Sequence, residues 1–126
     1  MLILLVEDDR VLRSALHKTL AIKGFDTLQA YNGIDAYRLV QQVGSNIDLL
    51  LTDINMPGMD GLSLAERTQQ MYPEMSVLLM TGYSAWLKRD REYVVLRKPF
   101  ALLTLLETVQ EISVLRTQSR RAEPAS

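Results

Sequence analysis

The chain has 126 residues, of which 48% are hydrophobic and 23% are charged, and its formal net charge is -1. This size and composition predict one globular domain whose core needs no disulfide or structural metal. The charge gives no electrostatic reason to expect this segment to bind nucleic acid or a membrane surface by itself. Cysteine is absent, which excludes thiol nucleophiles and cysteine-ligated zinc and favours a cytoplasmic location. The opening apolar run is too short for a signal peptide or a membrane span.

The apolar pattern alternates between two periods along the chain. Residues 2–6 form a short apolar run, which is typical of a strand buried on both faces of a parallel sheet. Residues 11–22 have helical spacing, with Asp9 as the expected N-cap and Gly24 as the expected stop. The alternation repeats, with strands predicted at residues 25–29, 48–52, 77–80 and 93–96 and helices at residues 34–43, 62–71 and 101–115.

This alternation predicts an α/β fold that is doubly wound: a five-stranded parallel sheet with helices on both faces. Residues 117–126 lack an apolar period. We expect them to form a linker or a disordered tail after a domain at residues 1–116.

Polar residues follow the predicted strands at the places where ligands bind in doubly wound folds, beyond the carboxyl ends of the strands. Because the carboxyl ends of parallel strands meet at one edge of the sheet, residues far apart in sequence converge there. The polar residues at these ends are Glu7, Asp8, Asp9, Asp53, Thr81 and Lys98.

These residue types are suited to phosphoryl chemistry. Magnesium prefers a few carboxylates, a carbonyl and several waters, and Glu7, Asp8 and Asp53 would supply the carboxylates. A carboxylate can also attack phosphorus and form an acyl phosphate, provided that positive charge offsets the repulsion. Lys98 supplies such a charge, and the Thr81 hydroxyl can donate a hydrogen bond to a phosphoryl oxygen.

Four motifs resemble the receiver domains of two-component response regulators. They are LLVEDD, LLTDINMPGMDGL, LLMTGY and RKPF, and they stand in the family's order on the matching strand ends, within a resemblance that covers residues 2–115. The resemblance implies a flavodoxin-like sheet with strand order 2-1-3-4-5, and a cis peptide bond between Lys98 and Pro99.

The resemblance also implies a role for each matching residue. Asp53 matches the phosphoacceptor, Thr81 the hydroxyl that meets the phosphoryl group, and Lys98 the lysine that pairs with it. Magnesium would be held by Asp8 directly, by Glu7 through water, by Asp53 and by the backbone carbonyl of Asn55. A sensor histidine kinase would donate the phosphoryl group. The chain would catalyse only its own phosphorylation and dephosphorylation, and its output would be a changed surface for an output domain or a partner protein.

The sequence departs from the family pattern in the switch region. Val95 occupies a position that usually carries Tyr or Phe, and Tyr93 is expected on the same face of the strand. The interval from Thr81 to Lys98 is short, which predicts a short or frayed fourth helix. Tyr83 would screen the phosphoryl group from water, or Tyr83 and Trp86 would both meet a partner; the alternative is that both rings cover that helix.

Other residues have simpler interpretations. Asp9 is expected to be a helix cap, Asp60 and Gly61 turn residues, and His17 a surface or packing residue. On the last helix, a core stripe is expected at Leu102, Leu105, Leu106, Val109 and Ile112. The surplus apolar residues Leu103, Val114 and Leu115 hint at a homodimer or a docking surface.

Three further functions compete with a free-standing or N-terminal receiver. The chain could be the receiver module of a hybrid sensor kinase or phosphorelay. It could be an aspartate-based phosphatase, although such enzymes resemble a DxD motif directly after the first strand, whereas the acids at Glu7 and Asp8 are contiguous. It could also be a pseudo-receiver that works by docking without phosphorylation, although the expected acids, threonine and lysine are all present.

Overall fold

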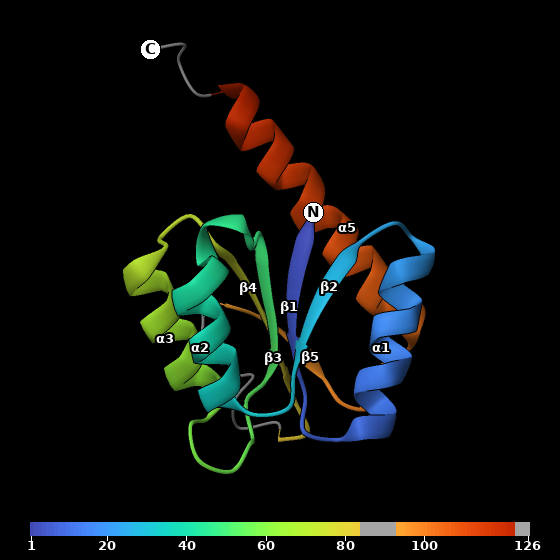
Figure 1. Cartoon of the computed structure of the whole chain (residues 1–126). Coiled ribbons are helices and arrows are strands. Elements are labelled where there is room, and N and C mark those ends of the chain that lie inside the picture. Colours follow the sequence, from blue (N-terminus) through green and yellow to red (C-terminus); the bar gives the residue numbers. More distant parts are fainter. Residues whose placement is uncertain (84–92, 123–126) are drawn as a thin grey trace.

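The computed structural model describes residues 1–83 and 93–122 and has a five-stranded parallel sheet with the order β2-β1-β3-β4-β5. The strands are β1 (Leu2–Val6), β2 (Asp26–Ala30), β3 (Leu49–Asp53), β4 (Ser76–Thr81) and β5 (Val94–Arg97). The helices are α1 (Arg10–Ile22), α2 (Gly33–Val43), the short 3-10 helix η1 (Gly44–Asn46), α3 (Gly61–Met71) and α5 (Leu102–Ala122). Figure 1 shows α2 and α3 on one face of the sheet and α1 and α5 on the other. The predicted fold class and strand order are therefore confirmed.

The expected short fourth helix and Trp86 lie outside the described residues. Within the described ranges, none of the helices combines the length and hydropathy needed to span a bilayer.

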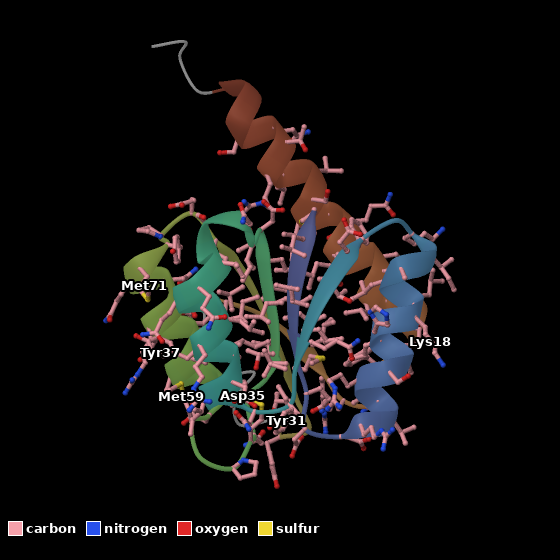
Figure 2. All side chains as sticks on the ribbon, in the orientation of Figure 1. Lys18, Tyr31, Asp35, Tyr37, Met59 and Met71 are labelled. Atoms are coloured by element: carbon pink, nitrogen blue, oxygen red, sulfur yellow. The ribbon has the colours of Figure 1, made fainter. Side chains whose placement is uncertain are left out.

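Alternating side chains of the buried strands divide the core into two halves. In β1, Leu4 and Val6 pack with residues of α2 and α3, whereas Ile3 and Leu5 pack with residues of α1 and α5. All four side chains are fully buried, and Figure 2 shows how side chains fill the space on both faces of the sheet. Burial on both faces explains why this strand is apolar throughout, without the alternation of a strand exposed on one side.

Local signals set the helix ends. Asp9 caps α1 by accepting hydrogen bonds from the backbone N–H groups of Val11 and Leu12, at 2.9 and 3.1 Å. Gly24 follows α1 with a φ of 82°, a conformation that suits glycine. Asp60, expected in a turn, instead caps α3 by accepting from the Ser63 N–H at 2.7 Å, and Gly61 is the first residue of that helix. An aspartate favours both environments because its carboxylate can bond to nearby backbone N–H groups.

Helix α5 differs from the prediction in two respects. It continues to Ala122, through residues 117–122 that were expected to be linker or disordered. Such a helix needs no apolar period, because its backbone hydrogen bonds are local and its residues tolerate helix well. Leu102 is 43% exposed and does not belong to the buried stripe, whereas Leu105 and Val109 are fully buried. The domain boundary at residue 116 stays a prediction.

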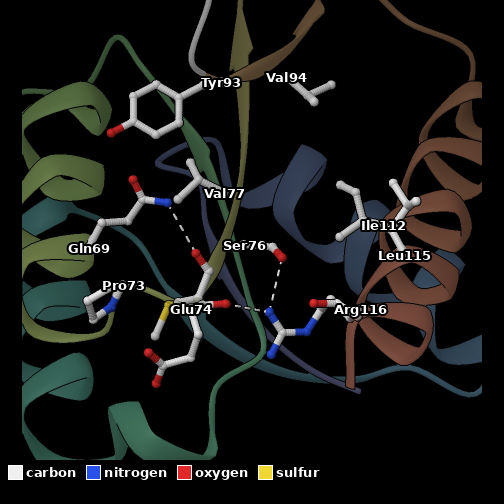
Figure 3. Close-up of a pocket in the computed structure, with 12 residues that line it drawn as sticks. Gln69, Pro73, Glu74, Ser76, Val77, Tyr93, Val94, Ile112, Leu115 and Arg116 are labelled. Atoms are coloured by element: carbon white, nitrogen blue, oxygen red, sulfur yellow. Dashed lines mark hydrogen bonds between the residues drawn. The ribbon is translucent and has the colours of Figure 1, made fainter. Parts of the chain in front are cut away.

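Arg116 fastens α5 to the amino ends of β3 and β4. Its guanidinium donates to the Glu74 carbonyl at 2.8 Å and to the Ser76 hydroxyl at 3.0 Å, as Figure 3 shows. It also pairs with the Asp48 carboxylate at 3.3 Å, and the other oxygen of Asp48 accepts from the Leu2 N–H at 2.8 Å. Arg116 thereby links α5 directly to β4 and to the residue before β3. Through Asp48 it also reaches Leu2, the first residue of β1.

We predict that Arg116→Ala destabilises the protein, because it removes the ion pair with Asp48 and the hydrogen bonds to Glu74 and Ser76. The expected loss is about 1–3 kcal/mol of unfolding free energy, measured by urea denaturation. Arg38→Ala is the control, because Arg38 is 70% exposed in its ion pair with Asp35 and should lose at most about 0.5 kcal/mol. Equal losses in the two variants would contradict an anchoring role for Arg116.

Candidate functional site

Three carboxylates meet at the carboxyl edge of the sheet. Glu7 and Asp8 follow β1, and Asp53 is the last residue of β3. Each offers a carboxylate oxygen, and these oxygens all lie within 4.8 Å of one another. Glu7 is fully buried, Asp53 is 6% exposed and Asp8 is exposed. Carboxylate oxygens at this spacing suit a hard cation such as magnesium, so the donor set fits the ion that the resemblance implies.

Backbone contacts hold the first two acids in place. The Glu7 N–H donates to the Ala30 carbonyl of β2 at 3.1 Å. Arg13, on α1, donates to the Glu7 carbonyl at 2.8 Å, and the Asp8 N–H donates to the Glu7 carboxylate at 3.0 Å. The chain therefore turns from β1 into α1 with both acids facing the edge. The Arg13 contact was not predicted, and nothing in the sequence pattern signals it.

A close approach shapes the chain after Asp53. A Cβ atom built on Gly61 would lie 2.0 Å from the Asp53 carbonyl oxygen, far inside van der Waals contact. The Gly61 N–H donates to the Ile54 carbonyl at 2.9 Å. Glycine at the start of α3 therefore lets that helix pack directly against the end of β3.

Lys98 bridges the two buried acids. Its ammonium donates to one oxygen of Glu7, and to an oxygen of Asp53 at 3.0 Å. Its backbone N–H donates to the Thr81 carbonyl at 2.7 Å, and the expected cis peptide bond joins it to Pro99. The side chain is 22% exposed, so one cation serves two carboxylates at the margin of the core.

Burial and charge act together on the ionisation of this cluster. Burial raises the pKa of the Glu7 carboxyl from its ordinary 4.5 to about 7, and the positive charge of Lys98 opposes that effect. Burial also disfavours the charged form of Lys98, but its hydrogen bonds to Glu7 and Asp53 prevail and raise the pKa of Lys98 above 10.5. The metal-free cluster thus holds a charged lysine and a carboxyl group that keeps its proton unusually well.

Thr81 and Asn55 complete the edge. The Thr81 hydroxyl donates to the Asn55 side-chain oxygen at 3.0 Å and accepts from the Tyr83 N–H at 3.1 Å. The Asn55 N–H donates to the Asp53 carboxylate at 3.2 Å. The structure thus brings together the six residues named from the sequence: Glu7, Asp8, Asp53, Asn55, Thr81 and Lys98. Their chemical roles stay predictions.

The structure describes three residues of the switch region, and also His17. Tyr93 and Val95 both pack against the core half beneath α2 and α3, so they share a face as expected. Tyr83 is 62% exposed at the site edge. His17 hydrogen-bonds to Thr27 between α1 and β2, which agrees with a packing role.

Comparison with known proteins agrees with this geometry. The sequence profile of the response regulator receiver domain matches residues 3–110. The chain is 38% identical over 117 residues to the response regulator receiver protein CpdR of Brucella abortus, which covers 89% of this chain and 96% of that protein. It is 30% identical over 115 residues to the sensor kinase CckA of the same organism, where the match covers 87% of this chain but 12% of the kinase.

Among solved structures, a two-component transcriptional regulator AraC from Clostridium phytofermentans ISDg is 30% identical, with a TM-score of 0.81, and the match covers 95% of this chain and 98% of that one. The strand order and the acids at the carboxyl edge of the sheet agree with the fold and the site that the sequence resemblance implies. The family profile matches most of the chain, which shows that this chain belongs to the response regulator receiver domain family.

Proposed function

We propose that this receiver domain accepts a phosphoryl group on Asp53 in a Mg²⁺-dependent reaction and thereby changes the surface that it offers to partners. The observation that carries the proposal is the Asp53 carboxylate itself. It lies within 4.8 Å of the oxygens of two other acids and 3.0 Å from the Lys98 ammonium. A carboxylate fixed beside a cation and a hard-ion donor set is suited to attack phosphorus.

Hydrogen bonds orient the nucleophile from both sides. One oxygen of Asp53 accepts from the Asn55 N–H and the other from Lys98. In the proposed reaction a carboxylate oxygen bonds to the phosphorus of a phosphohistidine on a partner kinase, the P–N bond breaks, and the electron pair returns to the imidazole. Lys98 offsets the charge that gathers on the phosphoryl oxygens.

Magnesium would be held by the carboxylates of Glu7, Asp8 and Asp53 and by the Asn55 carbonyl, and it would supply further positive charge for the phosphoryl oxygens. The chain would catalyse its own phosphorylation and the later hydrolysis of the acyl phosphate, with no small-molecule turnover. Steady hydrolysis of small phosphate esters would instead favour the aspartate-phosphatase alternative.

The proposed partners are a sensor histidine kinase and an output domain or partner protein. The chain spans almost all of CpdR but a small part of CckA, so a free-standing regulator and a module of a hybrid kinase are both open. The exposed Leu103, Val114 and Leu115 on α5 are compatible with the predicted homodimer or docking surface. The cytoplasmic location stays a prediction.

Phosphorylation is tested by intact mass after incubation with acetyl phosphate, with and without Mg²⁺. We expect one phosphoryl adduct on the wild type in the presence of Mg²⁺ and none on Asp53→Asn. Asp9→Asn is the matched control, because Asp9 caps α1 and asparagine caps equally well, so the adduct should persist. Absence of an adduct on the wild type under every condition would leave a pseudo-receiver that acts by docking alone.

A prediction about pH follows from the burial of Glu7 beside Asp53. The pKa of Glu7 is about 7 in the folded protein and 4.5 ordinarily. The folded state therefore holds a proton that the unfolded state has already lost, so this group's contribution to stability falls as pH rises through that interval.

In EDTA, which removes any bound metal, the unfolding free energy of the wild type should fall by up to about 3 kcal/mol relative to that of Glu7→Gln between about pH 5 and about pH 7.5. Urea denaturation at each pH measures it. Parallel pH profiles of the two proteins would show that Glu7 titrates normally.

A further inference from the structure

The Thr81 hydroxyl both donates and accepts a hydrogen bond in this structure. Thr81 is fully buried. Its oxygen accepts a hydrogen bond from the Tyr83 N–H, and its one proton is donated to the Asn55 side-chain oxygen. A hydroxyl has a single proton to donate, so this proton serves Asn55 and no other acceptor at the same time.

This contact conflicts with the role proposed for Thr81. To donate to a phosphoryl oxygen on Asp53, the hydroxyl must first leave Asn55. Asn55 adjoins Asp53, because its backbone N–H donates to the Asp53 carboxylate at 3.2 Å. Phosphorylation at Asp53 would therefore place a new, strongly negative acceptor beside the one that Thr81 uses now.

We propose that the Asn55 side chain is a latch that holds Thr81 in its unphosphorylated position and competes with the phosphoryl group for its proton. This inference rests on the proposed phosphorylation of Asp53. Asn55 then has two separate functions: its backbone faces Asp53 and the metal site, and its side chain restrains Thr81.

The latch also connects the site to the chain after β4. A rotation of the Thr81 side chain that takes its hydroxyl away from Asn55 would also move the oxygen that accepts from the Tyr83 N–H. Release of the latch thereby alters the start of the segment that follows Thr81. Asn55 is exposed, so its truncation opens no cavity in the core.

The test is a double-mutant cycle on the affinity for beryllofluoride in the presence of Mg²⁺, measured by calorimetry on the whole chain. The proteins are the wild type, Asn55→Ala, Thr81→Val and the double variant. Removal of the latch should tighten beryllofluoride binding by about fivefold, as expected for one neutral hydrogen bond. In the Thr81→Val background, which lacks the hydroxyl, Asn55→Ala should have no effect.

Three other outcomes would overturn the latch. Unchanged or weaker binding by Asn55→Ala, beside normal binding by the wild type, would overturn the latch and leave the proposed function intact. Equal weakening in both backgrounds would show that Asn55 contacts the phosphoryl analogue directly, which also overturns the latch. Failure of the wild type to bind at all would overturn the proposed function, and the latch with it.

A second measurement reports on the latch without the analogue or the metal. The Thr81 methyl resonance in metal-free Asn55→Ala should move from its wild-type position toward the position that it takes in the beryllofluoride-bound wild type. The Mg²⁺ affinity of Asn55→Ala is measured separately, so that the beryllofluoride affinities of the two proteins are compared at equal Mg²⁺ occupancy. A Thr81 methyl resonance that does not move on Asn55→Ala would contradict the latch.

Discussion

The shared ammonium of Lys98 is the interaction on which the site depends. Two buried carboxylates this close repel each other, and in apolar surroundings one of them would take up a proton. Lys98 donates to both Glu7 and Asp53 and so opposes that protonation, although burial still raises the pKa of Glu7 to about 7. Its backbone is fixed in turn by the Thr81 carbonyl. The charge balance of the site is therefore set by the pairing of β4 with β5.

Strand β3 has a different role at each of its two ends. Asp48, just before β3, receives Arg116 of α5 and the Leu2 N–H, whereas Asp53, at the other end, faces the acid cluster. The intervening Leu49, Leu50 and Leu51 are fully buried and join the two core halves. The anchoring end and the acid cluster thus lie at opposite ends of one close-packed, buried strand.

The sequence predicts those features that depend on burial and topology. Apolar runs mark β1, β3 and β4 because these strands are buried on both faces, and the acids converge because parallel strands end at one edge. The extension of α5 could not be read in this way, since an exposed helix has no apolar period. The contacts from Arg13 to Glu7 and from Thr81 to Asn55 depend on side-chain orientation across loops, and no local pattern encodes it.

Val95 leaves this chain without the aromatic ring that family members usually carry at this position. Where an aromatic ring usually follows the threonine, this chain packs a small aliphatic side chain against the core half beneath α2 and α3. Thr81 instead touches its surroundings through groups close to the backbone: the Tyr83 N–H, the Lys98 N–H and the Asn55 side chain. A change in the hydrogen bonding of Thr81 must then act on the segment after β4 and on the start of the Lys98–Pro99 turn. In the switch that we propose for this chain, the exchange of hydrogen-bond partners at Thr81 is the first step and takes the place of a rotating ring.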